Sequence, residues 1–296
     1  MVERTPILDF LTYFFLILGV VIVGFPVLYT IIAATLPLED VSKVPMPFMF
    51  GDQFLVNIKA AWEKGNLGTQ ILNSFIMATG ITIGKITVSL LGAFSIVYFD
   101  YKFRVIAFIS VFCTLMLPVE VRILPTYEMA AVNFLEPVNY IVNLFSNVEL
   151  ELEWNLLDSY TGLILPLIAS ATCTFLFRQF FLTVPEELCE AAKMDGASPM
   201  TFLRKILIPL SKTNIAALVV IEFVYGYNQY LWPLLITTNP KMTTAVIGLQ
   251  NLIPQADDIP EWNIALAAAL LVMLPPILVV LFMQRWFIKG LVDAEK

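Results

Sequence analysis

The chain has 296 residues, of which 59% are hydrophobic and 14% charged, with a mean hydropathy of +0.82 and a formal net charge of -7. These proportions differ from those of a soluble globular domain and indicate an integral membrane protein. Because the chain is acidic overall, it lacks the basic footprint that nucleic-acid binding requires. It contains no histidine and no cysteine pair with metal-ligand spacing, so we expect this chain to bind no metal and no cofactor.

Six runs of low charge are long enough to cross a membrane, which takes about 20 apolar residues. The first lies between Asp9 and Glu39 and is not followed by a signal-peptide cleavage pattern, so we expect it to be retained. The others cover about 72–99, the stretch after Arg104 to near Glu120, the stretch between Asp158 and Arg178, about 213–236, and the stretch between Glu261 and Arg285. The sequence therefore predicts an all-α membrane protein with six transmembrane helices.

The basic residues predict the orientation, because Lys and Arg collect on the cytoplasmic side of membrane proteins. With the N-terminus inside, eleven basic residues fall in cytoplasmic segments and five in external ones, and most acidic residues fall outside. We therefore expect both termini to be cytoplasmic. Cys113 and Cys173 fall inside predicted spans and Cys189 in a cytoplasmic loop, so we expect no disulfide.

The segment GITIGKIT at residues 80–87 is similar to a phosphate-binding P-loop. It is one residue short, however, and carries Ile86 where Ser or Thr should follow the lysine. Gly80 and Gly84 are better explained as a small-x-x-x-small face that lets helix backbones approach within a membrane. We therefore do not expect this chain to hydrolyse ATP.

A charged segment, EELCEAAKMDGASPMTFLRKILIP at residues 186–209, separates the fourth and fifth predicted spans. Pro185 and the two acids that follow it suit a helix N-terminus. Gly196 supplies a permissive turn, and Ser198 is a suitable N-cap with Pro199 at the first helical position. We predict a helix, a turn and a second helix; a plain amphipathic interfacial loop is the alternative.

The order of residues in this segment resembles the EAA loop of binding-protein-dependent ABC importer permeases. The matching positions are Glu190, Ala191, Ala192, Gly196, Ile206 and Pro209. The resemblance implies the type I (MetI-like) permease fold and a coupling loop that sits in a cleft of a separate ATPase subunit. The small Ala191 and Ala192 would allow close docking, and Glu190 could pair with a basic residue of the ATPase. The coupling residues implied are Glu187, Glu190, Ala191, Ala192, Asp195, Gly196, Ala197 and Ser198.

The resemblance covers almost the whole chain. The segment YNQYLWPLLIT at residues 227–237 and the tail FIKGLVDAEK are similar to the carbohydrate-uptake class of these permeases. Within that class, residues 84–99, 114–126, 156–181 and 196–214 are most similar to permeases for sn-glycerol-3-phosphate. This implies uptake of sn-glycerol-3-phosphate or glycerophosphodiesters, and the same machinery carrying an uncharged sugar is the main alternative. A secondary transporter is a less favoured alternative, because such proteins usually show internal repeats. An intramembrane enzyme is the least favoured, because it would need more than one acid-base group in the membrane.

The family resemblance also implies the partners and the domain organisation. The partners are a second permease subunit, a dimer of ATPase subunits that binds ATP and Mg²⁺, and a periplasmic substrate-binding protein, assembled in the bacterial cytoplasmic (inner) membrane. Residues 1–70 would form the first span and an external loop, residues 71–290 the ABC transmembrane domain, and residues 291–296 a cytoplasmic tail. Residues 133–155 make a longer external connection than the family leads us to expect. We predict a helical insertion that either touches the binding protein or is a family-specific ornament.

Two ionisable residues, Lys85 and Glu222, lie inside predicted spans. A charge at a helix centre costs roughly 2.5 to 3.5 kcal/mol on insertion scales, so such groups pair with each other or face a pathway. Lys85 therefore either forms an interhelical ion pair with Glu222 or belongs to an anion path. Arg122, beside Glu120 at the external end of the third span, suits either a phosphate ligand or an ion pair or membrane-edge anchor.

The fifth span carries a polar face at three-and-four spacing that could line the translocation route: Glu222, Tyr225, Gly226 and Gln229. Asn228 and Gln229 are candidate substrate contacts at its end. We expect three nearby aromatic residues to anchor the chain at the membrane interface instead: Tyr227, Tyr230 and Trp232.

Overall fold

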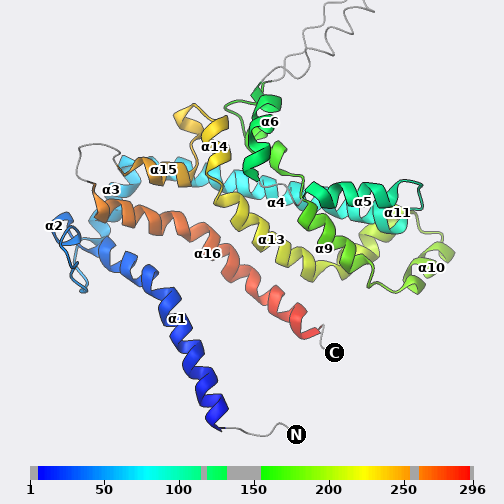
Figure 1. Cartoon of the computed structure of the whole chain (residues 1–296), viewed down its shortest axis with the longest axis horizontal. Coiled ribbons are helices and arrows are strands. Elements are labelled where there is room, and N and C mark those ends of the chain that lie inside the picture. The colour runs from blue at the N-terminus through cyan, green and yellow to red at the C-terminus, as the bar shows by residue number, and fades with distance from the viewer. Residues whose placement is uncertain (1–5, 115–118, 132–154, 254–259, 294–296) are drawn as a thin grey trace, which may run out of the picture. The chain divides into compact units, whose positions relative to one another are not determined.

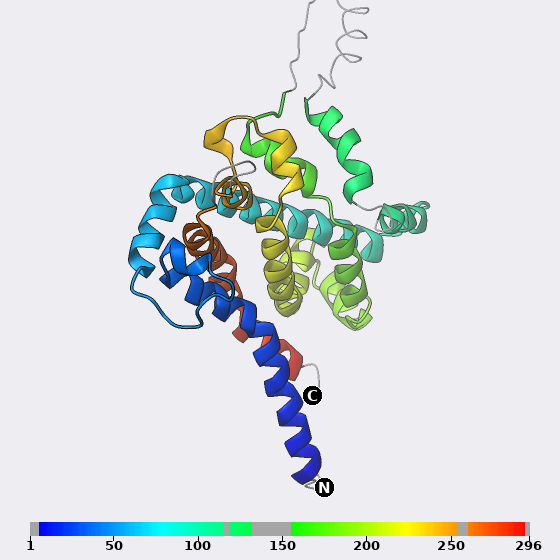
Figure 2. The same ribbon diagram turned by 60° about the vertical axis from the view of Figure 1, so that its left-hand side comes forward.

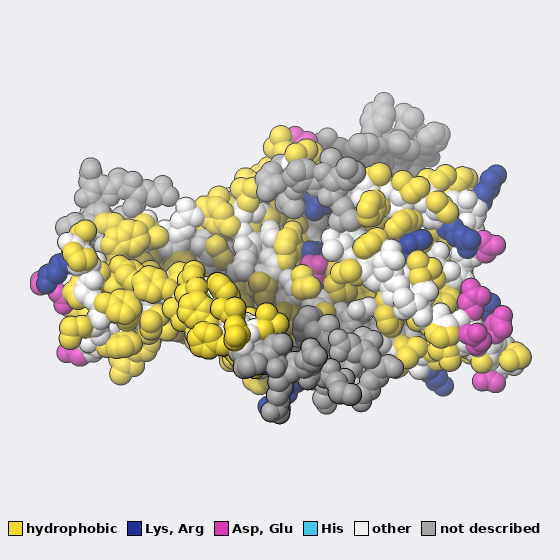
Figure 3. Space-filling view, turned by 60° about the horizontal axis from the view of Figure 1, so that its bottom comes forward, with side chains coloured by type: hydrophobic (Ala, Val, Ile, Leu, Met, Phe, Trp, Pro, Cys, Tyr) yellow, Lys and Arg dark blue, Asp and Glu magenta, His cyan; other side chains and the backbone are white. Residues whose placement is uncertain are grey.

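The computed structural model describes residues 6–114, 119–131, 155–253 and 260–293 (Figure 1). Every regular element within these ranges is a helix, as the sequence predicted. The chain divides into two compact units, one of Met1–Gly68 with Gly248–Leu274 and one of Thr69–Ile247 with Pro275–Lys296. Nearly all of the predicted insertion at residues 133–155 lies outside the described residues. The space-filling view shows hydrophobic side chains over much of the visible surface, with charged side chains in separate groups (Figure 3).

The first unit is built from α1 (Pro6–Thr35), α2 (Leu38–Val41), α3 (Phe54–Lys64) and the beginning of α16 (Trp262–Asp293). The side chains of α1 are exposed from residue 7 to residue 29 and almost all apolar, which suits a helix surrounded by lipid. Asn57 on α3 donates to the carbonyl oxygens of Ala34 and Leu36, at 2.9 Å each, and accepts from Asn263 at 2.8 Å. These bonds satisfy carbonyls at the end of α1 and tie α1, α3 and α16 together.

The second unit is organised around α4 (Leu67–Tyr98), which runs past α13 (Lys212–Tyr227) and α9 (Ala171–Phe181) in both ribbon views (Figure 2). Two glycines of α4 lie directly against the segment that comes just before α9 in the chain. A Cβ at Gly80 would overlap the side chain of Ile164, and one at Gly84 would overlap Ile168. The prediction that these glycines serve helix packing is confirmed.

Not every predicted span is a straight helix. Three helices are long and apolar enough to cross a membrane: Ile7–Thr35, Leu67–Tyr98 and Trp262–Arg285. Two bent pairs raise the number to five among the described residues, Tyr160–Leu167 with Ala171–Phe181 at 48° and Pro199–Leu210 with Lys212–Tyr227 at 75°. The third predicted span contains α5 (Arg104–Cys113), of ten residues, followed after residues 115–118 by α6 (Val119–Ala131).

The breaks have local causes. The fourth predicted span begins as α8 (Tyr160–Ile164) and stops after a 3₁₀ turn that contains Pro166, and Ser170 then caps α9 by accepting from the N–H of Cys173. The fifth was expected to continue to residue 236. Instead α13 ends at Tyr227, and the remaining residues form the separate α14 (Leu231–Ile236).

The expected interface anchoring of two aromatic residues is wrong. Trp232 is only 2% exposed and Tyr227 only 1%. The indole N–H of Trp232 donates to the carbonyl of Gly162 at 3.1 Å, and its ring packs with Met77 and Leu163. Both rings therefore belong to the protein core, while Tyr230 is half-buried.

The connection after α14 is fixed by a side chain from α4 and by Asp158, which lies two residues before α8. Asp158 accepts hydrogen bonds of 2.7 Å from the N–H groups of Thr238 and Asn239 and from the Thr238 hydroxyl. These bonds lower the pKa of the Asp158 carboxyl. The largest contribution comes from the Asn239 N–H and the next largest from the Thr238 hydroxyl. Asn73 on α4 donates to the carbonyl oxygens of Lys241 and Thr243. This connection is thereby held against α4 and α8.

Candidate functional site

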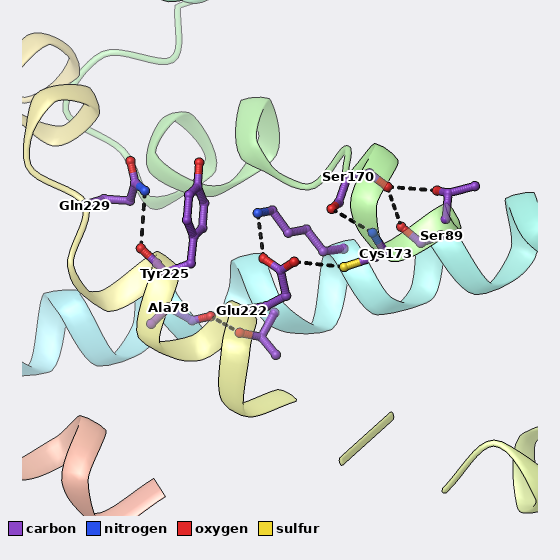
Figure 4. Close-up of polar contacts among 10 residues, drawn as sticks. Ala78, Ser89, Ser170, Cys173, Glu222, Tyr225 and Gln229 are labelled. Carbon is purple, nitrogen blue, oxygen red and sulfur yellow. Dashed lines mark hydrogen bonds and ion pairs between the residues drawn. The ribbon is translucent and has the colours of Figure 1, made fainter. Parts of the chain in front are cut away.

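A buried carboxylate joins three helices at the middle of the second unit. Glu222 on α13 accepts one charge-assisted hydrogen bond from Lys85 on α4, at 2.7 Å. Its other oxygen accepts from the thiol of Cys173 on α9, at 2.8 Å (Figure 4). The Lys85 and Glu222 side chains are only 8% and 7% exposed, and Cys173 is fully buried. The interhelical ion pair, one of the two alternatives for Lys85, is therefore present in the structure.

The surroundings of Lys85 explain how it is accommodated in an apolar region. Besides the carboxylate of Glu222, its ammonium faces the ring of Tyr225, with the nitrogen 3.7 Å from the ring centroid. A cation is attracted to the electron-rich face of an aromatic ring, more strongly where water is excluded. Tyr225 lies three residues after Glu222, so one face of α13 supplies both partners of the lysine.

Lys85 and Tyr225 also line a cavity of about 80 Å³. Arg122 on α6 lines the same cavity from another side, together with Thr126 one turn later and with Trp232. Lys85 and Arg122, which the sequence suggested independently as candidate phosphate-binding cations, therefore line the same cavity. Lys85 is paired with Glu222, so Arg122 supplies the excess positive charge there.

The remaining predicted pathway residues do not line this cavity. Asn228 is exposed at the C-terminal end of α13, and Gln229 donates to the carbonyl of Tyr225 at 3.2 Å. Gly226 instead provides close packing, because a Cβ there would lie 3.0 Å from the backbone of Ala78 on α4. Sequence reasoning missed Cys173 and Thr126. Thr126 was open to prediction, since it lies four residues after Arg122 and therefore on the same helix face.

The charged segment after α9 has the predicted local structure. Helix α10 (Glu186–Met194) follows Pro185, and Gly196 has a φ of +70°, in the left-handed region. Ser198 accepts from the N–H of Thr201, with Pro199 in the first turn of α11 (Pro199–Phe202). A π-helical turn (Leu203–Leu207) and α12 (Ile208–Leu210) then lead to α13. The helix, turn and second helix are confirmed.

Helix α10 has one face against the protein and one open face. Ala192 is only 7% exposed and belongs to a core cluster with Phe94 and Phe202, with Cys189 packed beside it. The small side chain of Ala192 therefore packs within this chain, beside Phe94 of α4, while Ala191 is exposed; the role of both alanines in close docking stays a prediction. The side chains on the open face include Glu187, Glu190, Ala191 and Met194, and Asp195 and Ser198 are exposed beyond it.

Comparison with known proteins agrees with this architecture. Residues 85–293 match the family described as binding-protein-dependent transport system inner membrane component. The chain is 49% identical to the sn-glycerol-3-phosphate transport system permease protein UgpE of Pectobacterium atrosepticum and 48% identical to that of Agrobacterium fabrum, with 100% of both chains covered in each case.

A solved bacterial ABC transporter involved in the import of the acidic polysaccharide alginate has a similar fold, with a TM-score of 0.73 at 16% identity over 97% of this chain and 99% of that chain. The all-helical, MetI-like fold that the sequence predicted is thereby confirmed. The described helices that could span a membrane indicate a multi-pass protein. The chain therefore belongs to the family of binding-protein-dependent transport system inner membrane components.

Proposed function

We propose that this chain is the permease subunit of an ABC importer for sn-glycerol-3-phosphate or its diesters and forms half of the translocation pore. The observation that carries the proposal is the cavity lined by both Lys85 and Arg122. The full-length similarity to permeases named for sn-glycerol-3-phosphate supports the same substrate.

The proposed site recognises the phosphate through its charge. A guanidinium presents paired donors to phosphate oxygens, and the Arg122 side chain reaches the cavity from α6. Lys85 is a second cation at the cavity. Its charge is balanced by the ion pair with Glu222. Among the described side chains that line the cavity or pair with its lining, the charges therefore sum to one net positive charge, which favours an anion over an uncharged sugar. Asn228 and Gln229 do not line this cavity. We propose that they contact the substrate elsewhere along the translocation pathway.

The proposed topology has six transmembrane helices with both termini in the cytoplasm of a bacterium. The three long helices and two bent pairs would provide five spans, and α5 with the residues that follow it would provide the sixth. The excess of basic residues in the segments assigned to the cytoplasm supports this orientation. Residues 71–290 form the proposed transmembrane domain.

In the proposed mechanism, ATP drives alternating access through partner subunits. A loaded binding protein delivers the substrate outside, and a dimer of ATPase subunits that holds ATP and Mg²⁺ closes inside. The exposed side chains of α10 and the turn at Gly196 carry that movement to α9 and α13, which flank this segment in the chain. Glu187, Glu190 and Ala191 are the proposed contacts with the ATPase, because their side chains are exposed. A second permease subunit supplies the other half of the pore.

Uptake into vesicles that contain this chain, its sister permease, the ATPase and the binding protein tests the proposal. Radiolabelled sn-glycerol-3-phosphate should enter in an ATP-dependent manner, and maltose-type sugars should not. Loss of a charge-assisted hydrogen bond costs enough to lower a rate about tenfold, which is the loss in uptake rate expected for Arg122→Gln. The control is Lys241→Gln, since Lys241 is an exposed cation that does not line the cavity.

The outcome separates the alternatives. Uptake of a sugar alone would keep the importer and overturn the phosphate substrate. Uptake without the ATPase would indicate a secondary transporter. Equal loss of uptake in Arg122→Gln and Lys241→Gln would remove the cavity as the site of recognition.

A further inference from the structure

A second basic cavity lies elsewhere in this unit, between α4, α5 and α9. Its volume is about 260 Å³, and Arg104 and Arg178 both line it. The rest of its wall is apolar and includes Val97, Val105 and Leu182. It shares no lining residue with the cavity at Lys85 and Arg122.

The charge in this cavity is not balanced by the acids that the structure places near it. The Arg178 guanidinium carbon lies 4.1 Å from the centroid of the Phe108 ring, a cation–π contact. Among the described residues, no carboxylate lies within ion-pair distance of Arg178. Arg104 is 3.3 Å from Asp100, but the Asp100 side chain is 94% exposed, so this pair contributes little. Lys102 adds a further exposed cation in the connection between α4 and α5.

The cavity lies where three helices begin or end. Helix α4 ends at Tyr98, α5 begins at Arg104, and Arg178 is in the last turn of α9, which contacts α5 (Figure 1). Ends of membrane helices lie at the depth of the lipid headgroups. Beyond Arg104, α5 exposes Val105, Ile106 and Ile109, so an apolar surface continues from the basic cavity along the helix.

We propose that this cavity binds the headgroup phosphate of an anionic phospholipid. Guanidinium groups hydrogen-bond phosphate oxygens in pairs, and basic pockets between membrane helices are suited to acidic lipid headgroups. The acyl chains then lie along the exposed apolar side chains of α5. A membrane-edge anchor would leave Arg178 in open water, whereas here Arg178 lines a half-open, mainly apolar cavity together with a second arginine. The bound lipid joins α5 to α9.

Native mass spectrometry of the purified transporter complex, exchanged into phosphatidylglycerol and phosphatidylcholine, tests the proposal. The wild type should retain phosphatidylglycerol in preference to phosphatidylcholine. The double variant Arg104→Gln/Arg178→Gln should retain about a hundredfold less, because each of the two lost charge-assisted hydrogen bonds weakens binding by about tenfold. The matched control is Lys212→Gln, which removes an exposed cation at the start of α13, outside this cavity. Excess inorganic phosphate should not displace the lipid, since the acyl chains contribute to its binding.

A second variant covers the case in which the double variant does not fold. Leu182→Trp keeps both arginines and narrows the cavity from its wall, so it should also reduce retention. Equal retention of phosphatidylglycerol by the wild type and the folded variants overturns the proposal. Binding of inorganic phosphate without retained lipid overturns the lipid as its source. If the Arg178→Gln complex loses another subunit but retains as much lipid as the wild type, the lipid proposal is also overturned. The cavity then belongs to a subunit interface.

Discussion

The Lys85 ammonium lies 2.7 Å from the Glu222 carboxylate, although the two residues are 137 positions apart in the chain. Their side chains are almost fully buried, and the thiol of Cys173 occupies the second carboxylate oxygen. Water is therefore replaced by protein partners on both charges. Removal of either partner leaves the other buried charge without its oppositely charged partner.

We expect Lys85→Met and Glu222→Leu each to destabilise the protein by about 3–5 kcal/mol, the usual cost of breaking a buried pair from one side. The double variant should recover most of this loss, because replacement of both charges by apolar groups is often neutral. Thermal unfolding of the purified chain in detergent provides the measurement. A double variant no more stable than either single variant would contradict a direct pairing.

The same double variant separates structure from transport. If Lys85 contributes to phosphate passage, the double variant should fold and associate with its partners but take up sn-glycerol-3-phosphate poorly. Normal uptake would assign Lys85 to the ion pair alone and leave Arg122 as the cation of the cavity. Arg122→Gln should not affect unfolding, since the Arg122 side chain is exposed.

Two glycines of α4 offer a matched test of helix packing. We expect Gly84→Ala to destabilise the protein by about 1–3 kcal/mol, the usual cost of overpacking, because the added methyl group would overlap Ile168. Gly92→Ala should be neutral or stabilising, since the nearest atom, on Thr174, is 3.8 Å from the new Cβ and alanine favours a helix by about 1 kcal/mol. Unfolding temperatures measured side by side decide this. Equal effects at the two positions would rule out close packing as the reason for Gly84.

The turn after α10 requires a residue that tolerates positive φ. Gly196 has a φ of +70°, and a Cβ added there would meet no atom within 4 Å, so substitution strains only the backbone. We expect Gly196→Ala to cost about 1–2 kcal/mol and Gly196→Asn less, because Asn tolerates the left-handed region better. ATP-driven uptake should fall in the same order. Full activity of the alanine variant would show that the turn does not set the geometry of coupling.

Charge reversal on the open face of α10 tests the proposed ATPase contact. Glu190→Lys should weaken association with the ATPase and lower uptake about tenfold, as expected when a charge-assisted contact becomes repulsive, without lowering the unfolding temperature. The control is Glu63→Lys on α3, whose side chain is 64% exposed and has only a 3.9 Å pair with Lys59. Co-purification and uptake provide the readouts. Normal association of Glu190→Lys would argue against a contact at this position.

The sequence by itself determined the features that depend on neighbouring residues. The long apolar runs at the two ends of the chain and at α4 form the three longest helices, because hydrophobic length is a local property. The structure of the charged segment was equally predictable. Pro185, Gly196 and Ser198 act on the backbone within a few residues of their own positions.

Only the tertiary structure decided which faces of these helices meet. It brought Arg122 on α6 to the cavity that Lys85 lines from α4, turned Ala192 toward Phe94, and buried Trp232 against Gly162. Each outcome depends on the rotation of one helix against another that is distant in the sequence. Apolar residues can face either lipid or protein in a membrane, so hydropathy carries no signal for that rotation. The close approach of α4 at its glycines and the buried charge pair fix it instead.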